Sequence, residues 1–321
     1  MCIRDSGSGS MATMYQATRT FDGRGCNVLW KHDGTKYYVV GINDELISQF
    51  ERSASVGFGG SWNGVLYDNP GNDAYYTDYF CPFRKIGLQS KYAYVFGDNG
   101  NYIFVTNGYS MQRFSLSTPY DLKTASTSGS KSQSFSIGYG PRDIVFNSTG
   151  TSYLVGPETQ NKWVKKFDLS TAWDITTQQE DTSAYLDLQA NSSGIGSPNG
   201  GCISEDGKHV YATQYAQSKV WQWTMTTPFD LSTASFVASQ SMTDAWTGCK
   251  ISPDGTQMIT RKASAEEESF RSWTLSTPYD ITTATYDKTF DVQDDLQGCP
   301  SPIFATGWVI QGGRFIMLPY Y

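Results

Sequence analysis

The residue types that usually carry catalysis are few in this sequence, and they do not fall into known catalytic spacings. Only two His occur among 321 residues, which leaves little material for a His-based metal or acid/base site. The six Cys include no Cys-x-x-Cys pair and no Cys/His spacing of a metal site. The segment GFGGSWNG at 57–64 lacks the Lys-Ser/Thr end of a phosphate loop, and no G-x-S-x-G motif occurs. We therefore expect no catalytic residues, no metal and no cofactor.

The chemistry that the sequence does offer is recognition by aromatic and polar side chains. Aromatic rings cover the apolar faces of sugars, while amide and carboxylate groups bond their hydroxyls. Chance could also produce this mixture, since 15% of the residues are aromatic. Candidate binding residues lie between the repeated segments described below: Arg24, Tyr139, Arg142, Asn199, Asp244, Trp246 and Asp295.

A second candidate surface is the segment 54–80, which departs from the repeat. It contains Trp62, Tyr75 and Tyr76, and insertions in repeat folds often become contact surfaces. The alternative is an outer strand that packs on its own unit.

The elements that must position these residues are repeated. FSLSTPYDLKTAS (114–126), FDLSTAWDITTQQ (167–179), WTMTTPFDLSTAS (223–235) and WTLSTPYDITTAT (273–285) are versions of one motif, spaced by 50 to 56 residues. The Asp that each motif contains can accept hydrogen bonds from backbone amides two or three residues on. We expect these four Asp to shape a turn rather than to catalyse.

A hairpin pattern precedes each motif. In KISPDGTQMIT (250–260), Asp-Gly lies between two apolar runs, and Gly tolerates the positive φ of a tight turn. A third alternating run leads into the motif and a fourth leads out, as in SFRSWTLS (269–276) and ATYDKTFDV (284–292). Four antiparallel strands in each unit of about 50 residues predict the blades of a β-propeller.

The repeat resembles that of β-propeller proteins from bacteria and phages, many of them from marine metagenomes. Their units combine a Pro-Arg-Gly start, a Ser-Pro-Asp-Gly hairpin and a linking motif close to WTLSTPYDITTAT. Here ISPDGTQMIT (251–260) matches the hairpin and GPRDIVFNSTGTSYLV (140–155) carries the start. The resemblance covers residues 81–298 and implies a propeller with a surface or virion role. It brings no catalytic residues.

The number of blades follows from the hairpin turns, and we predict six. The turns are expected at Gly34, Gly100, Gly150, Gly207 and Gly255, with a sixth near Gly307. A misreading of the first unit would make the number five or seven.

The last unit is expected to contain three strands and to lack its outer one. The segment MYQATRTFDG (14–23) resembles an outer strand and is predicted to complete that blade, which closes the ring without an open sheet edge. The predicted fold is therefore all-β: six four-stranded blades closed by an N-terminal strand.

Composition and charge indicate how the chain is divided into domains and which kinds of partner are excluded. Residues 1–10 contain the linker sequence GSGS and are expected to be a foreign, disordered leader, which leaves 11–321 as a single propeller domain. A formal charge of −7 without a basic stripe argues against nucleic acid as a partner. No apolar run is long enough for a membrane span, and no signal peptide is visible.

Four Cys follow a Gly at the start of a first strand: Cys26, Cys202, Cys249 and Cys299. Equivalent positions in successive blades are a poor guide to the distance between sulfurs. We expect these thiols to be buried and reduced, with disulfides as the alternative.

The leading functional hypothesis is a non-enzymatic binding or structural protein, a phage virion or bacterial surface component that contacts a glycan or a protein partner. Clean repeats, aromatic loops and the lack of catalytic motifs favour it. The alternative is a polysaccharide-processing enzyme, a hydrolase or lyase with carboxylates over the central channel. Two carboxyl groups about 5–9 Å apart would indicate the enzyme.

Overall fold

A computed structural model defines the fold. It describes the strands within 25–30, 36–41, 47–51, 304–311 and 314–320, and residues 93–106, 110–134, 141–158, 163–189, 194–214, 217–243, 248–263 and 268–291. These residues form twenty-two strands and five short 3-10 helices, and they contain no α-helix. In the part of the chain so described, no helix is long and apolar enough to cross a membrane.

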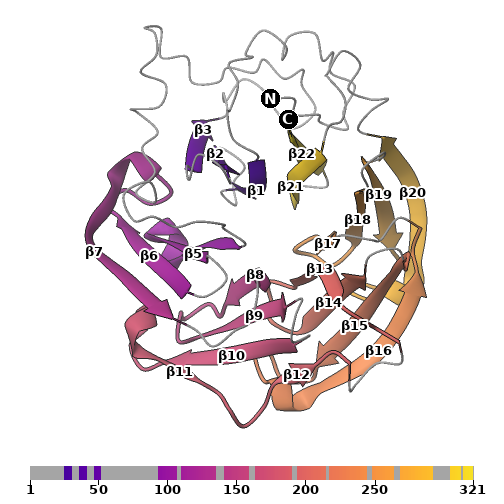
Figure 1. Ribbon diagram of the computed structural model, residues 1–321, viewed down its shortest axis with the longest axis horizontal. Coiled ribbons are helices and arrows are strands. Elements are labelled where there is room, and N and C mark those ends of the chain that lie inside the picture. The colour runs from indigo at the N-terminus through magenta and orange to yellow at the C-terminus, as the bar shows by residue number, and fades with distance from the viewer. Residues whose placement is uncertain are drawn as a thin grey trace, which may run out of the picture.

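The strands form antiparallel sheets arranged around a common centre, as in a β-propeller (Figure 1). The first sheet is β1 (Gly25–Trp30), β2 (Lys36–Gly41) and β3 (Ile47–Glu51). The second is β4 (Tyr94–Gly97), β5 (Tyr102–Thr106), β6 (Ser110–Leu116) and β7 (Ala125–Ser134). The third is β8 (Pro141–Phe146), β9 (Ser152–Glu158), β10 (Trp163–Leu169) and β11 (Gln178–Glu180), with β12 (Leu186–Asp187) also paired to β10. In every sheet the first strand lies nearest the centre.

The later sheets follow the same order. The fourth is β13 (Pro198–Ile203), β14 (His209–Gln214), β15 (Lys219–Met225) and β16 (Ala234–Ser241). The fifth is β17 (Gly248–Ile251), β18 (Gln257–Ala263), β19 (Glu268–Leu275) and β20 (Ala284–Asp291). The last is the pair β21 (Phe304–Gln311) and β22 (Arg314–Tyr320), which lies against β1 of the first sheet.

The all-β propeller is confirmed, while the number of six blades and the closure of the ring are not confirmed. The second to fifth sheets carry complete four-strand paths. The last sheet shows two strands in its described residues, where the sequence predicted three. Gly307 lies inside β21 at a register shift rather than in a hairpin turn, because a Gly in a strand is also suited to a bulge. The predicted closing strand at 14–23 and the leader at 1–10 lie outside the described residues.

The repeated motif joins the third strand of a blade to the fourth, as predicted, and it folds back on the hairpin of the same blade. Tyr279 has a φ of 66°, and its backbone N–H donates to the carbonyl oxygen of Gly255 over 2.8 Å. A Cβ atom placed on Gly255 would lie 2.5 Å from the Tyr279 ring. The hairpin glycine therefore provides both a positive φ and the space for an aromatic ring. The same pairing joins Trp173 to Gly150.

The motif Asp residues cap the short 3-10 helices that begin each outer strand. The side chains of Asp174, Asp230 and Asp280 accept hydrogen bonds from the backbone N–H two residues on. This is the turn-shaping role expected for them.

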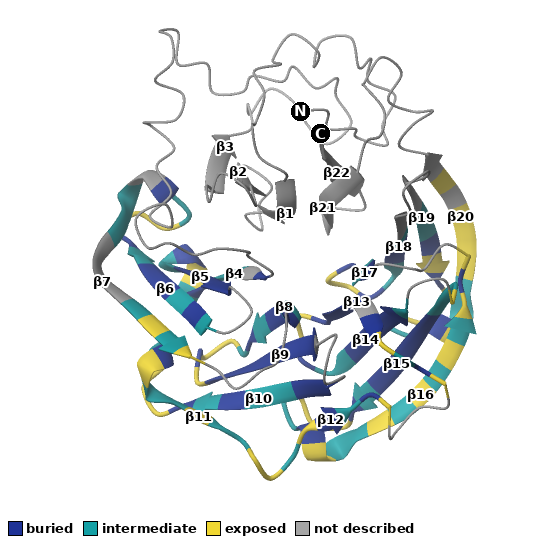
Figure 2. Cartoon of the chain, in the orientation of Figure 1, coloured by how far each residue is buried: buried dark blue, intermediate teal, exposed yellow. Residues whose placement is uncertain are grey.

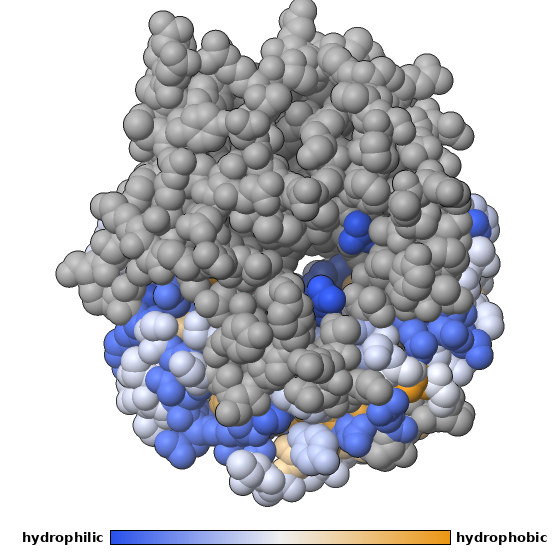
Figure 3. Space-filling view, viewed as in Figure 1, coloured by the Kyte–Doolittle hydropathy of each residue, from blue (hydrophilic) through white to orange (hydrophobic). Residues whose placement is uncertain are grey.

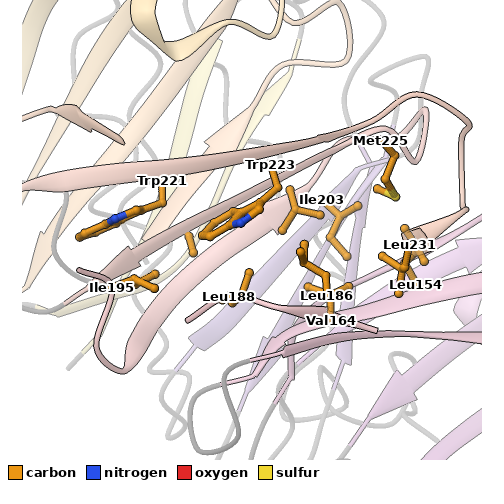
Figure 4. Close-up of a cluster of buried hydrophobic side chains, with 12 residues drawn as sticks. Leu154, Val164, Leu186, Leu188, Ile195, Ile203, Trp221, Trp223, Met225 and Leu231 are labelled. Carbon is orange, nitrogen blue, oxygen red and sulfur yellow. The ribbon is translucent and has the colours of Figure 1, made fainter. Parts of the chain in front are cut away.

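The core consists of apolar side chains between neighbouring sheets, with exposed residues concentrated on the outer strands (Figure 2). One cluster joins the third and fourth sheets, where Trp221 and Trp223 of β15 lie over Val164, Leu186 and other aliphatic side chains (Figure 4). Such burial of large aromatic side chains contributes strongly to the stability of the fold.

Polar contacts also join neighbouring blades. The buried Gln222 of β15 donates through Nε2 to the carbonyl oxygen of Tyr279 over 2.8 Å, and its Oε1 accepts from the N–H of Ile281 over 3.0 Å. Arg113 of β6 donates in the same way to the carbonyl oxygen of Trp173 over 2.8 Å. Each of these side chains fixes the aromatic corner of the next blade.

Candidate functional site

The inner strands of three successive blades bring charged and thiol groups together. Asp143 of β8 accepts a hydrogen bond from the backbone N–H of Ile203 in β13 over 2.9 Å. Its other oxygen lies 3.3 Å from Nζ of Lys250 in β17. We call Asp143, Lys250 and the neighbouring thiols of Cys202 and Cys249 the inner-strand cluster.

The topology explains why Asp143 can reach β13. An innermost strand pairs with only one neighbour, so one edge of β13 has no strand partner. A backbone N–H on that edge still needs an acceptor. The Asp143 carboxylate supplies it for Ile203 and thereby connects two blades.

The charged pair is partly open to solvent. The side chains of Asp143 and Lys250 retain 15% and 28% of their exposure. Burial alone would lower the pKa of Lys250. The nearby Asp143 carboxylate raises the pKa by more than burial lowers it, so the pKa is higher than that of a free lysine. Lys250 is therefore an ammonium ion at neutral pH.

Figure 3 shows hydrophilic residues on part of the edge of an opening near the centre of the ring. The strands that carry the inner-strand cluster, β8, β13 and β17, are the innermost strands of their sheets (Figure 1).

The cluster contains one carboxylate rather than two. Among the described inner strands β1, β4, β8, β13, β17 and β21, Asp143 is the only acidic residue. A polysaccharide hydrolase that works through a pair of carboxylates needs a second one. An ammonium beside a single carboxylate suits a different task, the stabilisation of negative charge on a carbonyl oxygen.

His209 packs against neighbouring side chains. Its ring stacks on Tyr279 of the next blade with centroids 4.7 Å apart, and Nδ1 lies 3.1 Å from Oγ1 of Thr224. Burial lowers its pKa, so it is neutral at pH 7. Within the described ranges, no three His, Cys, Asp or Glu side chains are grouped as metal ligands.

The structure places two of the predicted binding residues, and the binding role of every one stays a prediction. Arg142 lies on β8, half-buried and next to Asp143, and Asn199 lies on β13. The two strands belong to adjacent blades and are in contact. The remaining candidates lie outside the described residues: Arg24, Trp62, Tyr75, Tyr76, Tyr139, Asp244, Trp246 and Asp295.

Two cluster residues were missed from the sequence. Asp143 stands directly after Arg142 in the segment GPRDIVF, and Lys250 directly follows a Gly-Cys pair. The available signal was a charged residue in a segment that was predicted to form the innermost strand of a blade. The pairing itself carries no sequence signal, because it joins blades that are not consecutive.

Similar solved structures come from proteins with several different names. A Bacteroides uniformis protein provisionally named as a 6-phosphogluconolactonase is 16% identical, with 84% of this chain and 69% of that chain covered at a TM-score of 0.47. The periplasmic gluconolactonase of Pseudomonas aeruginosa is 14% identical, with 82% and 68% covered at 0.47. The Cps50 (Swd1) β-propeller domain of Myceliophteria thermophila is 9% identical, with 90% and 74% covered at 0.47. At these identities the likeness concerns the fold alone.

No protein-family model and no curated protein matches the sequence. The resemblance to the bacterial and phage repeat therefore stays a prediction.

The comparisons correct the leading functional hypothesis. The first choice was a non-enzymatic phage or surface binder, whereas the similar structures include proteins named as gluconolactonases, and that choice is not retained. The expectation of no enzymatic activity is not confirmed. None of the three similar structures named above carries a name that refers to a virion or to glycan binding.

Proposed function

We propose that this protein is a hydrolase that opens a cyclic ester of a sugar acid, a sugar lactone, at the inner-strand cluster. The observation that carries the proposal is the contact between Asp143 and Lys250, which joins the innermost strands of the third and fifth blades. When water attacks an ester, the carbonyl oxygen becomes an oxyanion that a positive group must stabilise. Lys250 can provide that positive group.

The reaction follows from the two charges. Water adds to the lactone carbonyl and releases one proton to the solvent, from which the ring oxygen later takes one up, and the negative charge that develops on the carbonyl oxygen is stabilised by the Lys250 ammonium. The ring C–O bond then breaks, the ring oxygen takes up a proton, and the product is the open hydroxy acid. Asp143 keeps Lys250 charged and oriented.

The surroundings favour a sugar-derived substrate. Arg142 lies on β8 and Asn199 on β13, which are two of the three strands that carry the cluster, and both residue types bond hydroxyl and phosphate groups. The single carboxylate of the described inner strands favours a lactone over a polysaccharide. The gluconolactonase names among the similar structures fall in the same substrate class.

Lactone hydrolysis by the purified full chain tests the proposal. Glucono-1,5-lactone, its 6-phosphate and a soluble polysaccharide are incubated with protein in a pH-stat, and the spontaneous rate is subtracted. We expect acid release from a lactone, at least 100-fold slower in Lys250→Met and partly retained in Lys250→Arg.

A matched control is Lys208→Met, on the β13–β14 hairpin outside the cluster. It should keep the wild-type rate. Thermal unfolding of each variant separates lost activity from lost folding. A wild-type rate equal to the spontaneous rate, or full activity in folded Lys250→Met, would rule out the proposed site.

We also propose that the ring has six blades and closes through the segment 14–23. The position of β21 and β22 against β1 supports it, because the last and first sheets are then neighbours. Deletion of 11–23 should lower the melting temperature and promote aggregation, whereas deletion of 1–10 should change neither. Equal stability of the two truncated chains would contradict closure by this segment.

A further inference from the structure

Two thiols from adjacent blades lie beside the charged pair. Sγ of Cys202 in β13 and Sγ of Cys249 in β17 are 4.0 Å apart. Both cysteines are free and almost fully buried, each with 1% exposure. The expectation of buried, reduced thiols is confirmed for these two, while Cys26 and Cys299 have no described side chains.

The short distance follows from the propeller geometry. Each Cys comes directly after a Gly on an innermost strand, Gly201 in one blade and Gly248 in the next. Blades are closest to one another at their inner strands, and β13 contacts β17. Equivalent positions in successive blades were not expected to predict the distance between sulfurs, but in this pair of blades they bring the two sulfurs close together.

We propose that Cys202 and Cys249 form a reversible disulfide that joins the fourth and fifth blades under oxidising conditions. A disulfide needs sulfurs about 2.05 Å apart, so the two must approach by about 2 Å, a shift within reach of side-chain rotation. The proposal does not depend on the hydrolase activity.

The reaction balances with a two-electron oxidant such as hydrogen peroxide. One thiolate attacks the peroxide O–O bond and becomes a sulfenic acid, which releases the first water. The second thiol displaces the sulfenic oxygen as a second water, and the S–S bond forms. Two thiols lose two hydrogen atoms, and one peroxide is reduced to two waters.

The environment predicts a slow but selective reaction. The hydrogen bond with Cys202 and the burial raise the pKa of the Cys249 thiol well above its usual value, so little thiolate exists at neutral pH. Once one sulfur is oxidised, its partner at 4.0 Å is already in place, which favours the disulfide over higher oxidation states.

The proposed disulfide can be detected in the wild-type chain by peptide mapping. Trypsin releases Cys202 on peptide 167–208 and Cys249 on peptide 220–250, and each peptide contains no other Cys. The native full chain is incubated with hydrogen peroxide, quenched with catalase, alkylated after unfolding and digested. We expect the two peptides joined, with a mass two hydrogen atoms below their sum, and separated again by dithiothreitol.

Thermal unfolding gives a second readout. The oxidised chain should melt higher than the reduced chain by on the order of 5 °C, because the link restricts the unfolded state. Cys249→Ser should show neither the joined peptides nor the shift. Cys81→Ser, which keeps both thiols, should show both.

The opposite result is equally clear. If peroxide oxidises other cysteines while Cys202 and Cys249 are both recovered alkylated, the proposal is wrong. Recovery of the pair as separate sulfinic or sulfonic acids would also overturn it, since the sulfurs would then have failed to meet.

Discussion

Asp143 and Lys250 are 107 residues apart in sequence, and their side chains meet at 3.3 Å across an intervening blade. Asp143 also holds the backbone N–H of Ile203 in that blade. One carboxylate therefore ties together the inner strands of three successive blades. The pair has two consequences, one for stability and one for the charge of the proposed catalytic lysine.

Replacing Lys250 by Met should destabilise the fold at neutral pH by about 1–3 kcal/mol, because Asp143 loses its charged partner in a partly buried place. The double-mutant cycle with Asp143→Asn measures this coupling by urea unfolding. Additive single and double variants would show that the contact contributes nothing.

The same pair predicts a pH dependence at the alkaline end. The pKa of Lys250 is raised in the folded chain above the ordinary value of 10.5, so the folded state holds this proton more tightly than the unfolded state. The stabilisation is complete below about pH 10 and is lost as the pH rises through the raised pKa. The stability difference between wild type and Lys250→Met should therefore shrink above pH 10.5. A constant difference up to pH 12 would contradict this linkage.

Adding one methyl group to a hairpin glycine should lower the stability of the fold strongly. Gly255→Ala combines a φ of +71° with a Cβ only 2.5 Å from the Tyr279 ring, so we expect a loss of about 2–4 kcal/mol in urea unfolding. Gly194→Ala is the matched control, since its φ is +103° but nothing lies within 4 Å of the added atom. It should cost about 1–2 kcal/mol from backbone strain alone. Equal losses would mean that the ring moves aside freely.

The fold was predictable from the sequence where the signal is local. The repeated Asp residues, the hairpin glycines and the order of strands within a blade follow from neighbours within about ten residues. The contact of Asp143 with Lys250 and the approach of Cys202 to Cys249 depend on how blades are placed around the centre, which no local pattern encodes. Gly307 shows the opposite error, because a turn residue can equally mark a bulge within a strand.

Asp174 should contribute more to stability than Asp280, the equivalent residue of the fifth blade. Asp174→Ala should cost more at pH 7 than Asp280→Ala, because Asp174 bonds Lys131 as well as capping its helix. We expect about 1 kcal/mol for the shared cap and about 0.5–1 kcal/mol more for the ion pair.

Burial alone would raise the pKa of Asp174, but hydrogen bonds from Lys131 and Thr176 outweigh it and lower the pKa below 3.8. Its contribution to stability is therefore present above about pH 4 and is lost as the pH falls through the lowered pKa. Melting curves between pH 7 and pH 2 measure the loss. If Asp174→Ala lost stability with acid as steeply as the wild type, another group would be responsible.

Gln222 provides the sharpest test of how neighbouring blades are held. In Gln222→Leu the buried N–H of Ile281 loses its acceptor, whereas the carbonyl oxygen of Tyr279 keeps the hydroxyl of Tyr211 as a donor. One unpaired buried N–H predicts a loss of about 1–3 kcal/mol in urea unfolding. Gln179→Leu, on the exposed face of β11, should change stability by less than about 0.5 kcal/mol.

A second substitution at the same position separates the amide's two roles. Gln222→Glu can still accept from Ile281 but can no longer donate to Tyr279, and it brings a charge into a buried site. We expect it to be at least as destabilising as Gln222→Leu at pH 8 and to recover part of the loss near pH 5, where a buried carboxyl takes up a proton and donates again. If Gln222→Leu were as stable as the wild type, the hydrogen bonds of Gln222 would contribute nothing to holding the fourth and fifth blades together.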